Sequence, residues 1–385
     1  MTETYPPEVN GVAMTLHRLV AGILSAGHTM QVVRPRQAVE SSHFEGQLEE
    51  LLVGSLPLPG YDGLRIGMPA VGRLKCLWKR QRPDVVHIAT EGPLGCAALW
   101  MARRMKISVV SSFHTNFHSY GAHYGVGLLQ GVSFAYLRAF HNYTAATFAP
   151  TRAICDELGG QGVRHTRVMS RGVDCELYQP AARCEKLRAS WIDHANALVV
   201  LYVGRIAQEK NMDCAIRGFY EIKRSQPDAR FVLVGDGPMR AELEQAHCEF
   251  IFTGFQRGAD LAKCYASADV FLFPSVTETF GNVLTEAMAS GLACVAYDYA
   301  AAREYASNAV NALLAAKGDE GGFIAAANRL ANHPGLVSQL GAAARDLAMQ
   351  LSWGAVVRAY LADTSAILQE GRSVMDAPLH TLETI

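Results

Sequence analysis

Short apolar runs, many followed by turn residues and then by an amphipathic stretch, recur along most of the chain. Uninterrupted apolar runs of this length are typical of strands that are buried in a sheet. The amphipathic stretches predict helices, for example residues 12–26, which stop at Gly27. The predicted strands are residues 31–34, 51–53, 83–88, 107–113, 145–149, 198–203, 231–234, 250–253, 270–273 and 294–297.

Residues 270–291 form the most informative succession of elements. An apolar run ends at Pro274, a glycine-containing loop follows, and a helix is predicted from Asn282 to Gly291. The amides of residues 281–283 are first-turn donors, which have no partner within the helix. A helix N-terminus of this kind binds anions, and phosphate is the usual one. The stretch therefore predicts a phosphate site.

Two carboxylates flank that predicted phosphate site. Glu278 lies in the loop, and Glu286 lies eight residues later in the helix. Next to a phosphate they would repel it unless each met another partner. Vicinal hydroxyls of a sugar or a ribose are natural partners, because a carboxylate is a strong acceptor. The alternative is a surface loop followed by an ordinary helical glutamate, and the spacing alone favours neither interpretation.

Two further loops bear on the type of nucleotide. The strand 198–203 is followed by Gly204, Arg205 and Lys210, and either cation alone would more often be a solvated surface charge. Residues 235–238, Gly-Asp-Gly-Pro, partly match the dinucleotide pattern G-x-G-x-x-G. Arg240 takes the place of the third glycine, which argues against a nicotinamide site.

The Glu-x7-Glu spacing with Phe-Gly-Asn after the first glutamate resembles the signature of the family 4 retaining glycosyltransferases. The Gly-Arg-x4-Lys run and the Gly-x-Gly-Pro turn are similar to segments of the same family, so the resemblance extends over nearly the whole chain. It implies an α/β protein of the GT-B architecture, with two facing Rossmann-like domains and parallel sheets.

The resemblance also implies the domain boundaries. Residues 168–174 are similar to the family's interdomain connection, and Ser352-Trp353 is similar to the start of its last helix. We therefore expect an N-terminal acceptor domain at residues 1–172 and a nucleotide-sugar domain at residues 173–352. A helix at residues 353–370 is expected to cross back to the N-terminal domain.

The family resemblance assigns a role to each candidate site residue. Arg205 and Lys210 are expected to bind the diphosphate and to stabilise the charge that builds on the leaving oxygen. Glu286 is expected to take the ribose hydroxyls, and Glu278 the donor sugar at its 3- and 4-hydroxyls. The remaining expected donor-site residues are Gly11 and His114 of the facing domain, Gly254 in the loop that holds the base, and Phe280, Gly281, Asn282 and Val283. Glu278 and His114 are the expected catalytic residues.

Composition limits the class of protein. The chain has 385 residues, half of them apolar and 18% charged, which fits a soluble globular protein with two domains. No apolar run reaches the length of a membrane span, and the first residues do not resemble a signal peptide. The nine cysteines are scattered and show no metal-ligand spacing, which indicates free thiols in a reducing cytosol. No metal and no cofactor are expected.

The acceptor is predicted from weaker signals. Residues 1–170 carry a net charge of +5, and the segment 64–82 combines an apolar stripe with basic residues. Such a segment either lies on an anionic membrane surface or is an ordinary helix with solvated lysines. The opening residues 2–13, the run 112–117 and the run 297–304 resemble bacterial mannosyl- and glucosyltransferases that act on membrane lipids. Residues 118–136 form a glycine- and aromatic-rich loop that can line the acceptor site.

The leading hypothesis is therefore a cytoplasmic enzyme, peripheral on the inner face of the membrane. It would move a hexose from a nucleoside diphosphate sugar, GDP-mannose or UDP-glucose in type, to a lipid such as diacylglycerol. Three alternatives stay open: a glycosyltransferase with a soluble acceptor, a nucleotide-sugar epimerase of the same fold, and a non-catalytic nucleotide-sugar binding protein. No nucleic-acid partner is expected. The start at Met1 indicates either a truncated or a very short first strand.

Overall fold

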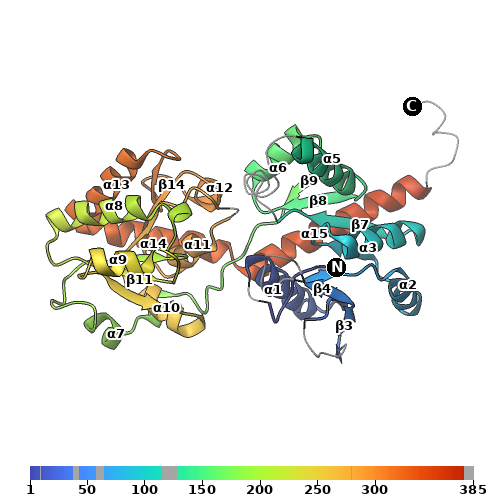
Figure 1. The fold of residues 1–385 in the computed structure, drawn as a ribbon, viewed down its shortest axis with the longest axis horizontal. Coiled ribbons are helices and arrows are strands. Elements are labelled where there is room, and N and C mark those ends of the chain that lie inside the picture. Colours follow the sequence, from blue (N-terminus) through green and yellow to red (C-terminus); the bar gives the residue numbers. More distant parts are fainter. Residues whose placement is uncertain (9, 38–42, 58–64, 115–127, 279, 377–385) are drawn as a thin grey trace. The chain divides into compact units, whose positions relative to one another are not determined.

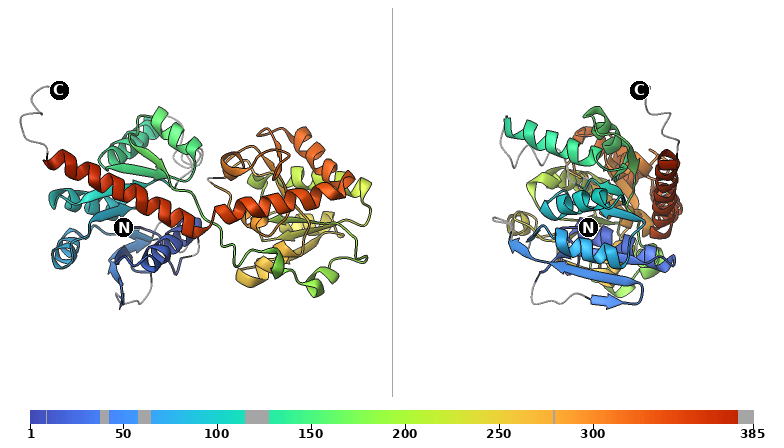
Figure 2. Two further views of the ribbon diagram at one scale, coloured as in Figure 1. Left: turned by 180° about the vertical axis from the view of Figure 1, so that it is seen from behind. Right: turned by 90° about the vertical axis from the view of Figure 1, so that its right-hand side faces the viewer.

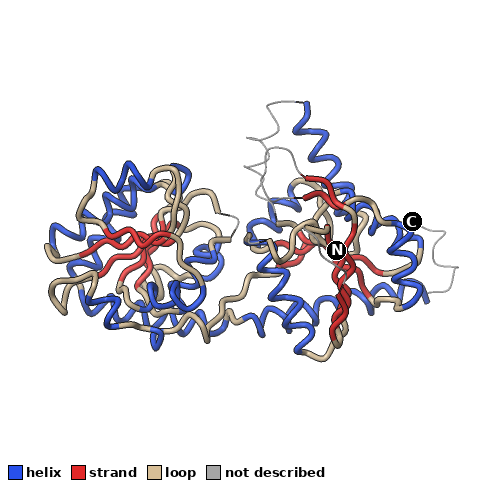
Figure 3. The backbone as a smooth tube through the Cα atoms, turned by 60° about the horizontal axis from the view of Figure 1, so that its bottom comes forward, coloured by secondary structure: helices blue, strands red, loops and turns tan. Residues whose placement is uncertain are grey.

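The computed structural model describes residues 1–8, 10–37, 43–57, 65–114, 128–278 and 280–376, which fall into two compact units (Figure 1). The first unit comprises residues 1–170 together with the segment from Trp353 onward, and the second comprises Arg171–Ser352. In each unit, strands occupy the centre and helices surround them (Figure 3). The sequence predicts the boundary after residue 172, and the division falls between Ser170 and Arg171.

The second unit contains one six-stranded sheet in which every pair of neighbours is parallel. Its order is β12-β11-β10-β13-β14-β15, so the first and fourth strands of the unit are neighbours. This is the strand order of a doubly wound nucleotide-binding fold. The strands are β10 (Val199–Val203), β11 (Arg230–Val234), β12 (Ile251–Gly254), β13 (Val270–Phe273), β14 (Ala293–Tyr297) and β15 (Leu313–Ala315).

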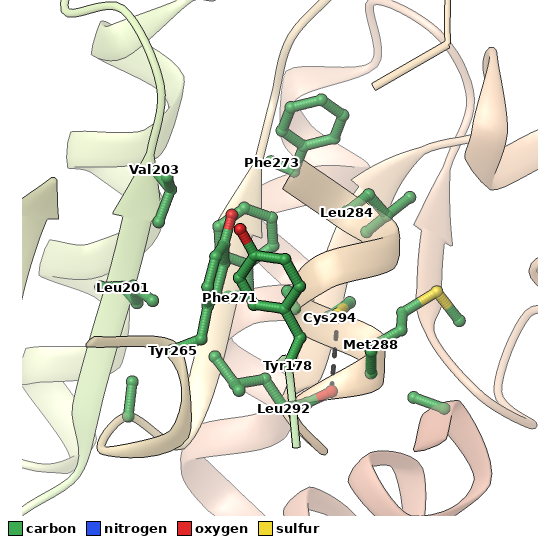
Figure 4. Packing of buried hydrophobic residues seen from close by; sticks show 14 of the residues in the cluster. Tyr178, Leu201, Val203, Tyr265, Phe271, Phe273, Leu284, Met288, Leu292 and Cys294 are labelled. Carbon is green, nitrogen blue, oxygen red and sulfur yellow. Dashed lines mark hydrogen bonds between the residues drawn. The ribbon is translucent and has the colours of Figure 1, made fainter. Parts of the chain in front are cut away.

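Both faces of this sheet are buried, as its uninterrupted apolar runs predict. Side chains alternate along a strand, so Leu201 and Val203 of β10 join one core cluster and Tyr202 joins the other. In the first cluster, β10 and β13 pack against the helix that follows β13 (Figure 4). The helices of the unit are α7 (Glu185–Ala189), α8 (Met212–Ser225), α9 (Arg240–Ala246), α10 (Gly258–Ala266), α11 (Asn282–Ala289), α12 (Ala301–Tyr305), α13 (Glu320–Asn332) and α14 (Pro334–Gln350), with the 3-10 turns η1 (Pro180–Ala182) and η2 (Gln208–Lys210).

The first unit is built around a parallel sheet of order β6-β7-β8-β9 and a smaller sheet of order β1-β3-β2. A separate antiparallel pair, β4-β5, precedes the second helix of the unit. The strands are β1 (Met30–Pro35), β2 (His43–Glu45), β3 (Leu48–Val53), β4 (Ser55–Pro57), β5 (Arg65–Gly67), β6 (Val85–Ile88), β7 (Ser108–Ser112), β8 (Ala146–Ala149) and β9 (Thr166–Val168).

Helices cover the two faces of the first unit's sheets. Val109 of β7 packs in a cluster with α2 and α3, and its neighbour Val110 packs in a cluster with α1 and α15. The last helix lies across its face of this unit, where a Cβ on Gly22 of α1 would stand 2.4 Å from Val357 (Figure 2). The helices are α1 (Gly11–Ser25), α2 (Val71–Arg80), α3 (Pro93–Arg104), α5 (Leu128–Asn142), α6 (Arg152–Gly160) and α15 (Trp353–Asp376).

The first residues of the chain join the two sheets of this unit. The Thr2 amide donates to the carbonyl of Val33 in β1, and the Ala89 amide after β6 donates to the carbonyl of Met1. The Met1 ammonium donates to the carbonyl of His87 at 2.8 Å. Burial lowers the pKa of this ammonium to about 5. Met1 and Thr2 thus supply the backbone contacts between β1 and β6 that a first strand would make.

The basic segment 64–82 differs from the prediction of one amphipathic stretch. It holds strand β5 and then helix α2, because Pro69 disfavours helical backbone at Met68 and the helix begins only after it. In the part of the chain that is described, no helix is long and apolar enough to cross a membrane.

Candidate active site

The second unit has a topological switch point between β10 and β13. The helix after β10, α8, packs in the cluster on one face of the sheet, and the helix after β13, α11, packs in the cluster on the other face. The two loops therefore separate at the carboxyl ends of adjacent strands, where open α/β sheets bind their ligands. The predicted cations lie after β10, and the predicted carboxylates lie after β13.

The loop after β10 is held by backbone contacts. Gly235, the residue after β11, lies very close to this loop. A Cβ on it would stand 2.0 Å from the carbonyl oxygen of Gly204. The Ile206 amide donates to the carbonyl of Asp236, and the Tyr202 hydroxyl donates to the carbonyl of Arg205 at 2.9 Å. The Gly-Asp-Gly-Pro turn thus has a structural role. It supports the loop that carries Arg205.

Lys210 and Glu278 meet across the switch point. Lys210 ends η2, and its Nζ lies 2.6 Å from Oε1 of Glu278. The Ser275 hydroxyl donates to the same carboxylate oxygen at 2.7 Å, and the Tyr299 hydroxyl donates to the carbonyl of Glu278 at 2.8 Å. Both charged side chains are about four-fifths buried, being 20% and 17% exposed. The pair is therefore fixed in place before any ligand arrives.

Gly281 opens the N-terminus of α11. Its backbone is left-handed, with φ +92°, and a Cβ there would lie 3.1 Å from the ring of Phe273. Because glycine has no side chain to cap the helix, the first-turn amides of Asn282 and Val283 face no such acceptor. The buried Oδ1 of Asn282 has no partner among the described residues. Phe280 is 1% exposed, so its side chain anchors the loop in the core.

Glu286 lies one turn further along α11. Its Oε2 accepts a hydrogen bond from the Tyr265 hydroxyl at 3.0 Å. Burial raises the pKa of this carboxyl to about 7, and the Tyr265 hydrogen bond opposes the rise only in part. A carboxyl that is close to half-ionised at neutral pH gains from a partner that donates hydrogen bonds to its charged form.

Of the other two predicted donor-site positions of this unit, Arg205 is exposed and Gly254 is half-buried. The Arg205 guanidinium is 65% exposed and lies 3.3 Å from the Glu209 carboxylate, so it shares the loop with Lys210 but does not contact Glu278. Gly254 ends β12 with φ +70°, and its carbonyl accepts from the Gly235 amide. The next residue, Phe255, is 63% exposed, with the guanidinium of Arg257 lying 4.6 Å from its ring centroid.

The first unit carries His114 and Gly11. His114 follows β7, and its Nε2 hydrogen-bonds to the Ser112 hydroxyl at 2.8 Å. That hydroxyl also bonds to Nε2 of His87 at 2.9 Å, and the other ring nitrogen of His87 bonds to the Tyr360 hydroxyl at 2.9 Å. Burial lowers the pKa of His87 to about 3, so this ring is neutral. A polar chain therefore links α15 to His114.

Gly11 is the exposed first residue of α1. The helix is capped by Asn10, whose Oδ1 accepts from the amides of Val12 and Ala13. The assignment of Gly11 and His114 to the donor site stays a prediction. Most of the predicted acceptor loop, residues 118–127, lies outside the described residues.

Sequence reasoning missed several residues that shape the site. Ser275, Tyr299 and Tyr265 hold the two glutamates, and each is an ordinary polar residue whose position only the fold reveals. Arg171 is another: it is 8% exposed, and its guanidinium carbon lies 5.9 Å from the ring centroid of Phe280. Its buried position could not be read from a connecting segment.

The apolar stripe of the basic segment is covered by protein. Leu74, Leu77 and Trp78 of α2 are buried in the core of the first unit. Lys75 and Lys79 on the same helix are exposed. The apolar side of α2 therefore packs against α3 and the sheet, as in an ordinary helix with solvated lysines. The cationic side of α2 stays open to solvent.

Two Rossmann-like units, one with a fixed lysine–glutamate pair beside an uncapped helix N-terminus, define a glycosyltransferase of the GT-B fold. Solved structures agree on the fold. Sucrose-phosphate synthase from Thermosynechococcus elongatus superposes with a TM-score of 0.72 at 17% identity, covering 98% of this chain and 96% of that one. Anabaena HepE in complex with UDP gives a TM-score of 0.71 at 18% identity, covering 95% and 99%.

Sequence relatives identify the family. Residues 9–177 match the model described as Glycosyltransferase Family 4, and residues 197–333 match the one described as Glycosyl transferases group 1. The GDP-mannose-dependent alpha-mannosyltransferase of Mycobacterium tuberculosis is 33% identical over 79% of each chain. That of Mycolicibacterium smegmatis is 30% identical over 96% of each chain. The chain belongs to glycosyltransferase family 4.

A third relative carries a lipid in its name. The alpha-monoglucosyldiacylglycerol synthase of Streptococcus pneumoniae is 27% identical over 77% of this chain and 70% of its own length. The sequence-based predictions of the α/β GT-B fold and of a glycosyltransferase are thus confirmed.

Proposed function

We propose that this glycosyltransferase moves a hexose, with retention at the anomeric carbon, from a nucleoside diphosphate sugar to a lipid acceptor such as diacylglycerol. The observation that carries the donor half is the Lys210–Glu278 pair at 2.6 Å beside the uncapped N-terminus of α11. It combines one cation and a helix dipole for a diphosphate with a carboxylate for a sugar. An epimerase or a dinucleotide enzyme would not need this combination.

The proposed chemistry is a single exchange at the anomeric carbon. The bond from that carbon to the distal phosphate oxygen breaks, and a bond to the acceptor hydroxyl oxygen forms on the same face. The acceptor proton passes to the leaving phosphate oxygen, so atoms and charge balance without a further base. Arg205, Lys210 and the first amides of α11 would stabilise the charge that collects on the diphosphate.

Glu278 and Glu286 divide the neutral part of the donor between them. Glu278 would accept hydrogen bonds from the 3- and 4-hydroxyls of the hexose, and Glu286 those from the ribose hydroxyls. This agrees with their environments. Glu278 is already ion-paired, and burial raises the pKa of Glu286 to about 7. Glu278 would orient the sugar and would not need to become a covalent nucleophile. We expect His114 to assist from the other unit.

The lipid acceptor is supported by two observations. The synthase of Streptococcus pneumoniae is named for a glucosyldiacylglycerol product, and the exposed lysines of α2 give the first unit a cationic surface. A cationic surface attracts anionic lipid headgroups without any inserted segment. A peripheral position on the membrane follows from this proposal. A soluble acceptor is the alternative, and the same experiment distinguishes it.

The test incubates the purified chain with radiolabelled UDP-glucose or GDP-mannose and with vesicles of diacylglycerol in anionic phospholipid. We expect label to appear in the organic-solvent extract, in an α-linked glycolipid by NMR. Label in water-soluble product only would favour a soluble acceptor. Donor binding without any transferred label, over a panel of acceptors, would contradict the enzymatic proposal.

A further inference from the structure

Arg171, the first residue of the second unit, is a buried cation with no hydrogen-bond or ion-pair partner among the described residues. Among the residues that are described, its guanidinium makes no hydrogen bond and no ion pair, and its buried Nε lacks an acceptor. Two other arginines are equally buried, and both have partners. Arg34 binds Glu50 at 2.8 Å, and Arg188 binds Asp269 at 2.8 Å. Those two are structural, and Arg171 is not satisfied in the same way.

The position of Arg171 ties it to the donor loop. Its guanidinium carbon lies 5.9 Å from the ring centroid of Phe280, the residue directly before the left-handed Gly281. The nearby carboxylate, Glu278, is already bound by Lys210 and Ser275. Burial lowers the pKa of Arg171 to about 10, while the charge of Glu278 acts in the opposite direction. Lys210 and Arg171 thus carry more positive charge than the single carboxylate of Glu278 balances.

A buried guanidinium is costly unless an anion compensates it. Its planar fork of donors matches the oxygens of a phosphate, which a lysine can meet only as a point charge. Because Glu278 is the proposed sugar-binding residue, the phosphate within reach of this corner of the site is the one that carries the sugar.

We propose that Arg171 binds the distal phosphate of the nucleoside diphosphate, as a third cation beside Arg205 and Lys210. The inference rests on the proposed donor site. It goes further in assigning part of the leaving-group stabilisation to the segment that connects the two units. The charge on this phosphate rises as the bond to the sugar breaks, so Arg171 would act on the rate as well as on affinity.

The test measures nucleotide binding by calorimetry in wild type, Arg171→Met and Arg171→Lys, with UDP and GDP each compared with its monophosphate. Arg171→Met keeps the apolar stem and loses the charge. We expect it to weaken diphosphate binding about ten- to a hundredfold and monophosphate binding by less than about twofold. Arg171→Lys is expected to restore part of the loss. Arg224→Met, in which an exposed arginine paired with Glu221 is removed, serves as the matched control.

Thermal unfolding of the free protein gives an independent readout. Replacing an unpartnered buried charge by an apolar side chain should leave the melting temperature unchanged or raise it. A structural arginine would lower it. If Arg171→Met does not fold, the arginine is structural and the inference is wrong.

Unchanged diphosphate affinity in Arg171→Met would overturn the inference while the proposed function stands. An equal loss for mono- and diphosphates would overturn it too, because the contact would then not be at the distal phosphate. A loss confined to donors with an acidic sugar, such as UDP-glucuronate, would move the contact to the sugar and also contradict it. Failure of the wild type to bind any nucleoside diphosphate would instead reject the proposed function itself.

Discussion

Glu278 is oriented before a sugar binds. Lys210 and Ser275 both contact the same carboxylate oxygen, and Tyr299 holds the backbone of the residue. A carboxylate that is fixed in this way loses little conformational freedom when a ligand binds to it. It also leaves its second oxygen to a ligand, since these contacts all involve Oε1 or the main chain. Preorganisation of this kind contributes more to the transition state than to ground-state affinity.

We therefore expect Glu278→Ala to lose turnover far more than donor affinity. The estimate is about a hundred- to a thousandfold in kcat, because the sugar is no longer held as its bond breaks. Single-turnover kinetics and calorimetry with the same donor measure the two effects. Lys210→Ala, by contrast, should weaken both, since the diphosphate carries charge in both states. Normal turnover in Glu278→Ala would show that the carboxylate is not part of the site.

The pH dependence of nucleotide binding should follow Glu286. Burial raises the pKa of this carboxyl to about 7, and only its ionised form accepts both ribose hydroxyls. Affinity for a nucleoside diphosphate is thus expected to rise with pH through about 7. For the free protein the sign is opposite. Since the folded pKa lies above the unfolded one, this group makes the free energy of unfolding fall as pH rises from about 4.5 toward about 7.

Calorimetric titrations between about pH 6 and about pH 8 check this dependence, because they bracket the pKa of about 7. In Glu286→Gln the binding should be weaker, and its rise through about pH 7 should disappear. Tyr265→Phe removes the hydrogen bond that lowers this pKa, so it should shift the rise to higher pH. A wild-type affinity that is flat across this range would contradict the assignment.

The loop between β13 and α11 depends on one glycine. Gly281 sits at φ +92° with the Phe273 ring 3.1 Å from where a Cβ would stand, so both backbone conformation and space exclude a side chain. Local backbone conformation, and not helix propensity, therefore shapes the loop in which we propose that the phosphate binds.

Gly281→Ala is expected to destabilise the second unit by about 1–2 kcal/mol, the usual cost of a left-handed non-glycine residue. This corresponds to a fall in melting temperature of a few degrees, about 2–4 °C per kcal/mol. Nucleotide affinity should fall as well. Gly335→Ala is the matched control, since a Cβ there meets nothing within 4 Å and the residue lies in α14. Equal behaviour of the two variants would show that the loop tolerates a side chain.

Helix α15 is linked by hydrogen bonds to the carboxyl end of β7 in its own unit. The chain runs from Tyr360 through His87 and Ser112 to His114, and each of its contacts is 2.8–2.9 Å. The ring of His87 stacks on that of Tyr360 with centroids 5.5 Å apart. Helix α15 is thus connected, through the side chains of His87 and Ser112, to a residue far from it in sequence.

Tyr360→Phe should cost about 1–3 kcal/mol, because it leaves a buried nitrogen of His87 without its partner. Chemical denaturation monitors the loss in the first unit. The matched control is Tyr143→Phe, since that tyrosine is 60% exposed in the same unit. If His114 acts in the reaction, Tyr360→Phe should also lower kcat with little change in KM. A loss of stability equal to that of the control would show that the hydrogen bond from Tyr360 to His87 does not contribute to the free energy of unfolding.

The whole molecule has a weakly negative net charge, but the charge is divided unequally. The formal net charge is −1, and residues 1–170 carry +5. Part of this excess lies on α2, whose apolar side is buried and whose lysines are exposed. Any attraction to a membrane through this helix must therefore be electrostatic and must weaken with salt.

Charge removal on α2 tests this surface. The double variant Lys75→Gln, Lys79→Gln is expected to weaken binding to anionic vesicles about tenfold or more, at roughly 1 kcal/mol per lysine. Cosedimentation at low and high salt measures it, with neutral vesicles as the lipid control. Lys263→Gln in the second unit, where the lysine pairs with Asp260 at 2.9 Å, is the matched variant. Binding that resists high salt would contradict an electrostatic surface.

Much of the second unit follows from the sequence. Its buried strands are uninterrupted apolar runs, and the prediction of β13 at 270–273 coincides with the structure. The loop residues could be named because strand, glycine and charge follow one another along the chain. The elements of the first unit were harder to predict. Short strand pairs such as β2-β3 and β4-β5 lack long apolar runs, and Pro69 divides the basic segment.

The sequence by itself determined the fold class, the family and which charged residues are candidates for the donor site, because these depend on local order along the chain. Only the tertiary structure decided which charges have partners. It places Lys210 on Glu278, leaves Arg171 without a partner among the described residues, and buries the apolar side of α2. The physical reason is that pairing and burial depend on which strands become neighbours, and β10 lies beside β13 although 66 residues separate them.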